Sequence, residues 1–403
     1  MTGFLVNTLY FVVPFLLVIG LVITVHELGH FLAGKAVDAK IDQFSIGFGK
    51  PIARWKDKSG VEWRLGWLPI GGFVRFAGDD NAASVPVKED LDILREEILE
   101  REGAAALRRY HYFKPLWARA LISVAGPLAN FLLSIAIFGG LLLAMGEAIA
   151  PAKIAKVMPN TPAAQAGLLP GDVLLKANGQ TVKTFDTIKQ LVILRTGVPI
   201  DLLVDRAGRQ LQLSVTPVRG NVPDTTGRIH RMGTIGVAFA QTPVRIQHYG
   251  PVEALAGGVD RTVGVVKTTL FYLGRMFAGH EAADQISGPL GMAQISHDLA
   301  KETAEGSANI ATAIANQALT ILILAANISV GIGFLNLMPI PVLDGGHLLF
   351  YAYEAVARRP LAAKVQAAGY RVGLALVLGL MLFATWNDLQ RLRVFNFLGG
   401  LHS

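Results

Sequence analysis

The sequence has no cysteine among its 403 residues. Disulfide frameworks, thiolate zinc sites and cysteine nucleophiles are therefore excluded, and any metal must be held by histidine, aspartate or glutamate. Charge is absent over three long stretches, because residues 1–25, 120–146 and 306–343 contain no Asp, Glu, Lys or Arg. With 52% hydrophobic residues and a mean hydropathy of +0.44, the chain is too apolar for an ordinary soluble protein. It is an integral membrane protein.

The net charge of +7 comes from basic residues that flank the apolar blocks and form no contiguous tract. This distribution favours a topology signal over nucleic-acid binding. The chain is expected to lie in a lipid bilayer and to have no nucleic-acid partner.

Together with a fourth and shorter apolar block at residues 372–386, these three stretches predict about four transmembrane helices. A cleavable signal peptide is the alternative for the first block. Against it, there is no basic segment before the apolar run, and the helical pattern continues through residues 26–30 instead of ending at a small-residue cleavage site. The third block ends in Asn336-Leu337-Met338-Pro339-Ile340-Pro341, which cannot be regular helix because two prolines remove donors. Irregular backbone at membrane depth is tolerated only inside protein or beside a watery cavity, so this segment is expected to be functional.

Orientation follows from the basic residues near the span ends. Residues 35–119 and 358–371 carry most of them, whereas the N-terminus has none. The positive-inside rule then places these loops in the cytoplasm and both termini outside, although Arg391 and Arg393 count mildly against this orientation.

A soluble module at residues 151–241 separates the second and third spans. It alternates short β runs with two helical stretches, at 163–166 and 186–194, and Asn178-Gly179 is a strong hairpin turn. The stretch Ala166-Gly167-Leu168-x-x-Gly171-Asp172 makes the module resemble a bacterial PDZ domain. A structural spacer with an empty groove is the alternative.

Residues 251–278, after the module, are apolar but carry Asp260, Arg261, Lys267 and Arg275. That is too much charge for a span. It fits an amphipathic helix on the outer membrane surface, or equally a helix packed on the soluble module.

The first span contains His26-Glu27-Leu28-Gly29-His30. Histidines four residues apart share one face of a helix, so both can ligate one zinc ion (Zn2+). Glu27 lies beside them, placed to accept a proton from the attacking water. The alternative is a helix whose polar residues face a neighbouring helix, but such residues are costly in a membrane without a function.

A catalytic zinc site needs a third protein ligand. Asp344 is the acidic residue at the end of the third block. The first and third spans run in the same direction and carry their polar groups near their C-terminal ends. Asp344 is therefore expected at the depth of His26 and His30, with helix capping as its alternative role.

These motifs resemble the site-2 protease family of intramembrane zinc metalloproteases, in particular its bacterial branch that regulates sigma-E. The resemblance also covers Gly47-Phe48-Gly49, Gly126-Pro127-x-x-Asn130, Ser287-Gly288-Pro289 and Asn336-x-x-Pro339-x-Pro341-x-Leu343-Asp344-Gly345. It implies that His26, His30 and Asp344 bind zinc, that Glu27 is the catalytic base, and that Asn336 holds the substrate or the developing oxyanion. It also implies cleavage of a single-span membrane protein of the anti-sigma factor type, already trimmed outside, in the bacterial inner membrane.

Two substrate-binding regions follow from the same resemblance. Strands around residues 63–76, with Gly71 and Gly72 at their bend and Phe73 beside them, resemble a membrane-dipping β-hairpin that pairs with an unwound substrate. In PDZ domains of this type the peptide-binding strand comes last and binds a peptide or carboxyl terminus. That places the binding loop at Gly233-Thr234-Ile235-Gly236-Val237. The best-known member carries two PDZ modules, and this chain has room for one.

The expected fold is a polytopic α-helical membrane protein with a membrane-associated β-hairpin region and an inserted extracytoplasmic PDZ (α+β) domain. The expected division is as follows: first span with HExxH, 1–36; cytoplasmic and membrane-dipping β region, 37–119; second span, 120–146; PDZ domain, 151–241; amphipathic linker, 242–305; third span, 307–346; cytoplasmic loop, 347–371; fourth span, 372–386; tail, 387–403.

Two other function classes compete with the protease. A PDZ-bearing membrane scaffold with a vestigial metal site would be favoured by loss of a motif residue, but His26, Glu27, His30 and Asp344 are all present. A transporter with broken helices would explain the irregular third block, yet no inverted repeat of that block is apparent and HExxH has no role in a transporter.

Overall fold

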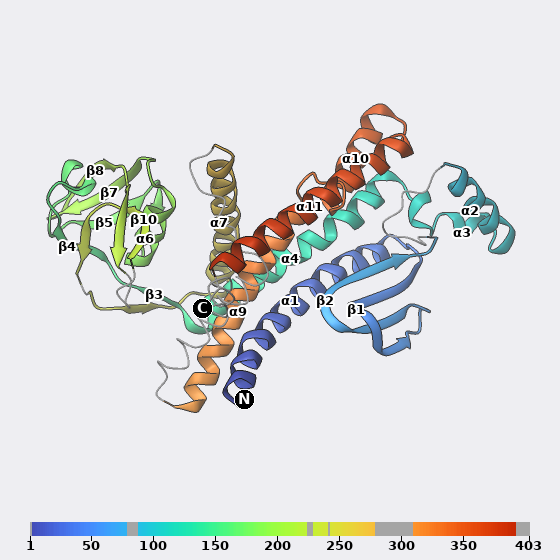
Figure 1. The fold of residues 1–403 in the computed structure, drawn as a ribbon, viewed down its shortest axis with the longest axis horizontal. Coiled ribbons are helices and arrows are strands. Elements are labelled where there is room, and N and C mark those ends of the chain that lie inside the picture. Colours follow the sequence, from blue (N-terminus) through green and yellow to red (C-terminus); the bar gives the residue numbers. More distant parts are fainter. Residues whose placement is uncertain (1, 79–87, 224–228, 241, 279–308, 392–403) are drawn as a thin grey trace, which may run out of the picture. The chain divides into compact units, whose positions relative to one another are not determined.

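The computed structural model describes residues 2–78, 88–223, 229–240, 242–278 and 309–391 (Figure 1). The chain forms two compact units. The first combines Met1–Gly140 with Leu255–Ser403, and the second is Leu141–Ala254. The motif at residues 287–289 lies outside the described residues.

Within the described residues, four helices of the first unit are long and apolar enough to cross a membrane, as predicted. The last candidate span, Ala363–Gln390, is considerably longer than the expected 372–386. These helices expose large apolar side chains such as Leu17, Leu132 and Leu382, as lipid-facing surfaces do. The four are α1 (Thr2–Ala36), α4 (Leu116–Met145), α9 (Ile310–Asn336) and α11 (Ala363–Arg391).

Helix α9 ends at Asn336, just before the two prolines, as predicted. A turn follows, and α10 (Asp344–Ala357) begins at the aspartate. The first part of the segment expected as a loop, residues 347–357, is therefore helical, and the prediction of a loop is wrong there. Acidic Asp344 in the first helical turn and the good helix formers after Gly346 favour a helix there.

A β-hairpin packs against α1, formed by β1 (Ile41–Lys56) and β2 (Glu62–Phe76). Its turn lies at residues 57–60, where Asp57 accepts hydrogen bonds from Ser59 and Val61. Phe44 pairs with both Val74 and Trp63, so the two ends of β2 lie on opposite sides of the first part of β1. The predicted strands are present, but the glycine pair lies within β2 and does not form the hairpin turn. Three short helices follow: α2 (Lys88–Arg101), α3 (Ala104–Leu107) and η1 (His111–Phe113).

Helix α7 (Pro251–Phe277) comes close to α4 at one place. A methyl group at Gly258 would lie 2.6 Å from the carbonyl oxygen of Ile135, which shows how close the two backbones come. One turn later, the hydroxyls of Ser134 and Thr262 are 3.1 Å apart and fully buried. Small residues thus allow two helices to approach closely, as in membrane helix pairs.

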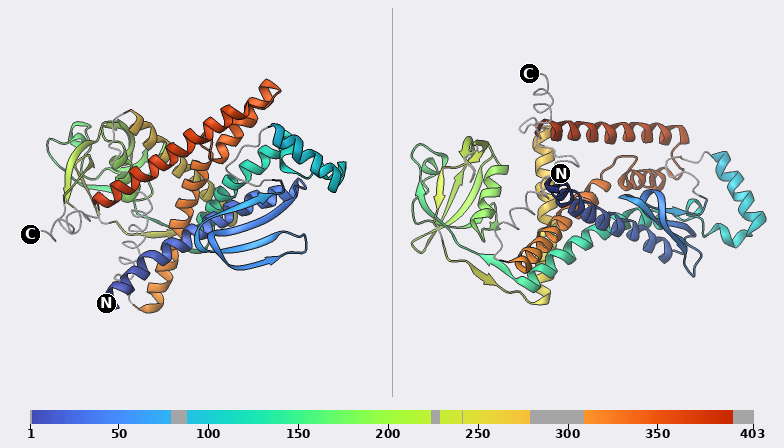
Figure 2. Two further views of the ribbon diagram at one scale, coloured as in Figure 1. Left: turned by 45° about the vertical axis from the view of Figure 1, so that its right-hand side comes forward. Right: turned by 60° about the horizontal axis from the view of Figure 1, so that its bottom comes forward.

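The second unit has the PDZ arrangement of a small antiparallel sheet with two helices (Figure 2). The strand order is β11-β4-β5-β7-β8, with β6 paired to β5. The hairpin at Asn178-Gly179 and the last-strand position of β11 agree with the predictions. The elements are β4 (Ala152–Val157), α5 (Pro162–Gln165), β5 (Val173–Ala177), β6 (Gln180–Thr181), α6 (Phe185–Leu194), β7 (Ile200–Arg206), β8 (Arg209–Val215) and β11 (Val237–Phe239).

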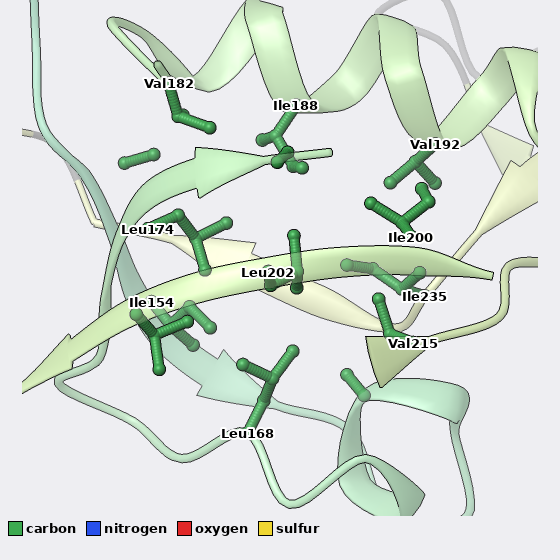
Figure 3. Packing of buried hydrophobic residues seen from close by; sticks show 14 residues of the cluster. Ile154, Leu168, Leu174, Val182, Ile188, Val192, Ile200, Leu202, Val215 and Ile235 are labelled. Carbon is green, nitrogen blue, oxygen red and sulfur yellow. The ribbon is translucent and has the colours of Figure 1, made fainter. Parts of the chain in front are cut away.

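An apolar core lies between α6 and this sheet, where Leu174, Ile188, Ile200 and Leu202 are almost fully buried (Figure 3). Two strand pairs were not predicted. Strands β9 (Val218–Pro223) and β10 (Ile229–Thr234) form one pair. Strands β3 (Glu147–Ile149) and β12 (Arg245–Gln247) form the other, which joins the entry of the unit to its exit.

Candidate metal centre

One face of α1 carries both histidines of the first motif. Because they are one helical turn apart, their Nε2 atoms come within 3.2 Å of each other. His26 is 7% exposed. At Gly29, between them, a methyl group would lie 2.8 Å from the carbonyl carbon of Ala125, so α1 can approach α4 only through a glycine.

Asp344 completes the group from the opposite end of the sequence. Its carboxylate oxygens lie 3.2 Å from Nε2 of His26 and 3.5 Å from Nε2 of His30. Within the described residues these three form the group that could hold a metal ion. The edges of a tetrahedron with zinc–ligand bonds of about 2.0–2.1 Å measure roughly 3.3–3.4 Å. The donor atoms therefore fit zinc, and the side chains are already gathered.

Helix α4 contacts the Nδ1 side of both imidazole rings. Nδ1 of His30 donates to the carbonyl oxygen of Ile122 at 2.8 Å. Nδ1 of His26 lies 3.2 Å from the side-chain amide of Asn130. Between these two residues is Gly126, where a methyl group would overlap Nε2 of His30 and lie 2.9 Å from Nε2 of His26. Each Nδ1 is thus engaged by α4, and each Nε2 remains for the metal.

Glu27 lies between the histidines and strand β2. The backbone N–H of Val74 hydrogen-bonds its carboxylate. A methyl group at Gly72 would lie 2.9 Å from Cγ of Glu27, so the strand runs close against the side chain. Gly71, with φ +112°, instead packs on the ring of Phe48. Of the glycine pair, Gly72 is the one beside the site.

A cavity of about 340 Å³ opens onto these groups. It brings together most of the predicted site, since Asn336 and Phe73 line it with the two histidines, Glu27 and Asp344. Four further polar residues, none of them part of a predicted motif, also line the cavity: His111, Ser123, His347 and Tyr351. Burial, with the nearby charge of Arg119, lowers the pKa of His111 to about 4, so its ring is neutral at neutral pH. A histidine or tyrosine beside a span has no sequence pattern that identifies it in advance.

The predicted peptide-binding loop lines a separate groove in the second unit. Residues Gly233, Thr234, Ile235, Gly236 and Val237 all border it, opposite Ile188 and Val192 of α6, and its volume is about 140 Å³. Gly236 has φ +78°, and Thr161 blocks any larger side chain there, so the loop conformation requires glycine. The groove lies between the last strand and the second helix, where PDZ domains add a peptide strand.

Comparison with known proteins gives the same result as the geometry. The model of peptidase family M50 matches residues 14–380. The chain belongs to peptidase family M50. Metalloprotease MmpA of Caulobacter vibrioides is 47% identical to it over the full length of both chains. A putative zinc metalloprotease of Agrobacterium fabrum is 43% identical over 97% of this chain and 98% of its own.

The M50 peptidase assignment makes the protein a zinc metalloprotease of the site-2 type, and Zn2+ its cofactor. Among solved structures, the PDZ domain of an SdrC-like protein from Listeria monocytogenes matches 22% of this chain and 85% of its own. The match has 17% identity and a TM-score of 0.18, too low to carry an argument.

Proposed function

We propose that this M50 peptidase cleaves single-span membrane proteins of the anti-sigma factor type, within or at the edge of the bilayer, after a first cut outside. One observation carries the proposal. The two histidines of α1 and the aspartate at the start of α10 lie at distances that suit zinc ligands, and a glutamate lies beside them on an otherwise apolar span. The cost of placing these groups in a membrane is expected only where function requires it.

In the proposed centre, His26, His30 and Asp344 would hold the zinc ion. Bound zinc supplies Lewis-acid polarisation of the scissile carbonyl and lowers the pKa of water toward neutrality. Ile122 and Asn130 engage the Nδ1 atoms, so both rings present Nε2 to the ion. The Asp344 carboxylate neutralises part of the charge there.

Glu27 is the proposed general base. Its carboxylate accepts the proton of the attacking water and later delivers it to the leaving amine. The Val74 N–H and the close backbone at Gly72 hold it on the cavity side of α1. Asn336 lines the same cavity and is the proposed donor to the substrate carbonyl or the developing oxyanion.

Strand β2 is the proposed docking edge for the substrate. A transmembrane helix hides its carbonyls in internal hydrogen bonds, so the substrate must unwind locally before hydrolysis. Pairing with residues 71–73 would compensate the lost backbone bonds. The proposal is supported by Phe73 on the cavity wall and by Gly72 against the base.

For the second unit we propose an extracytoplasmic position and binding of a peptide or carboxyl terminus at the loop 233–237. Single cysteines can test the orientation without background, since the chain has none. Gln180→Cys should react with a membrane-impermeant thiol reagent in intact cells, and Lys58→Cys should not. The reverse labelling would overturn this orientation.

The experiment for the function as a whole is comparative membrane proteomics of cells that produce wild type or Glu27→Gln. Single-span fragments that lack their outer domains should accumulate in the variant. A scaffold with a vestigial metal site, the second candidate, predicts identical fragment profiles in the two strains.

A further inference from the structure

Helix α4 contributes a stripe of three positions to the metal centre, at a spacing of four residues. The Ile122 carbonyl accepts from His30, Gly126 leaves room for both Nε2 atoms, and the Asn130 side chain contacts His26. Residues four apart lie on one helix face. The two histidines of α1 are also four apart, so the two helices match turn for turn. His30 contacts a backbone carbonyl of α4, whereas His26 contacts a side chain, that of Asn130.

Asn130 is 0% exposed, in a helix that crosses an apolar environment. Ser329 of α9 donates to its backbone oxygen at 2.8 Å, so its surroundings are packed by a third helix. The amide nitrogen Nδ2 lies 3.2 Å from Nδ1 of His26, and Oδ1 has no hydrogen-bond partner within the described part of the chain. A buried amide atom without a partner costs about 1–3 kcal/mol. Packing alone would therefore favour an apolar residue such as leucine at this position.

The metal centre explains the amide. His26 presents Nε2 to Asp344, and a neutral imidazole that ligates through Nε2 carries its proton on Nδ1. A protonated Nδ1 needs an acceptor. An asparagine amide places its oxygen and nitrogen in nearly the same volume, and the hydrogen-bond network decides which one faces the ring. With zinc on Nε2, the Nδ1 proton would require Oδ1 at this position, which the Asn130 amide supplies when it is turned by about 180° from the orientation in the structure.

From this geometry we infer that Asn130 is a positioning residue of the zinc centre. Its Oδ1 accepts the Nδ1 proton of His26 and fixes the ring in the tautomer and orientation that bind zinc. The inference rests on the proposed zinc centre and assigns a task to a residue that touches neither substrate nor metal. Its counterpart on His30 is the Ile122 carbonyl, which no side-chain substitution can remove.

The test compares zinc affinity and stability in three variants of the full-length protein in detergent micelles. Zinc affinity is measured by competition with a chromogenic chelator, and the stability of the metal-free protein by thermal unfolding. Asn130→Leu should bind zinc about 10- to 100-fold more weakly, the usual effect of losing such a partner. The metal-free variant should be at least as stable as wild type, because the unpartnered amide atom is gone.

Asn130→Asp supplies acceptor oxygens only and should keep an affinity close to that of wild type. Ser134→Ala is the matched control. It removes another fully buried polar group one turn further along α4, whose partner is Thr262, and zinc affinity should not change.

Equal zinc affinity in wild type and Asn130→Leu would overturn the inference, and so would an Asn130→Asp variant as weak as the leucine variant. A loss of metal-free stability in Asn130→Leu that parallels the loss of affinity would also overturn it, since the amide would then serve the fold. If wild type itself bound no zinc, the proposed zinc centre would fail instead.

Discussion

The metal centre and the core of the second unit differ in the kind of side chain that they bury. In the second unit, Leu174, Leu202 and their neighbours form an apolar core. In the first unit, large apolar side chains such as Leu132 are exposed, and polar groups such as His26 and Asn130 are buried. The first arrangement is stabilised by the hydrophobic effect and tolerates repacking. The second depends on close backbone approach and on complete hydrogen bonding, so small changes there should have larger effects.

The largest effect is expected from a single methyl group on α4. Gly126→Ala places that methyl on the Nε2 atoms of both histidines, so zinc binding and cleavage should both be lost. Gly140→Ala, on the same helix, is the control, because a methyl group there meets nothing within 4 Å. Zinc per chain, measured by elemental analysis, should remain at the wild-type level in Gly140→Ala. Full zinc in Gly126→Ala would contradict the described approach of α4.

A smaller effect is expected in the core of the second unit. Leu202→Ala removes a 1% exposed side chain and should lower the unfolding free energy of the fragment Leu141–Ala254 by about 2–5 kcal/mol. Leu169→Ala truncates a leucine that is 48% exposed and should change it by less than about 0.5 kcal/mol. Urea unfolding followed by circular dichroism gives both values. In the full-length protein, Leu202→Ala should keep its zinc, and a loss of zinc would show that the two regions are not independent.

The smallest effect is a pH dependence within the second unit. The guanidinium of Arg206 donates to both oxygens of Asp172, whose side chain is fully buried. These hydrogen bonds hold the pKa of Asp172 below its ordinary value, against the opposing effect of burial. Because the pKa of Asp172 is lower in the folded state, the pair with Arg206 stabilises the fold fully at pH values above the unfolded-state pKa of about 3.9. This stabilisation is lost as the pH falls through the folded-state pKa.

Unfolding of the fragment should therefore become easier below about pH 4, and Asp172→Asn should flatten this part of the pH profile. Urea midpoints measured between pH 2 and pH 7 check the prediction. Identical slopes for the variant and wild type in the acidic range would show that Asp172 contributes nothing to the pH dependence.

The sequence predicted those parts of the molecule whose patterns are local. Charge-free runs predicted the four helices, and Asn178-Gly179 predicted a hairpin because few other turns accept that pair. His26 and His30 were predictable from their helical spacing, and Asp344 from its place after the third apolar block. Asn130 received no role, because a lone amide in a span indicates a polar partner without naming it. The approach of α7 to α4 was not predicted, because small residues such as Gly258 and Thr262 do not indicate which helix they contact.

In the proposed mechanism three side chains bind zinc, and a fourth, Glu27, transfers the proton without holding the ion. The most direct test measures zinc content and peptide-bond cleavage together, in purified Glu27→Gln, His30→Ala and Asp344→Ala with a detergent-solubilised single-span substrate. Glu27→Gln should keep near-stoichiometric zinc, with cleavage reduced by about 10²–10⁴-fold. The other two variants should lose zinc and cleavage together. Near-normal cleavage by Glu27→Gln, or full zinc in His30→Ala and Asp344→Ala, would contradict the proposed mechanism.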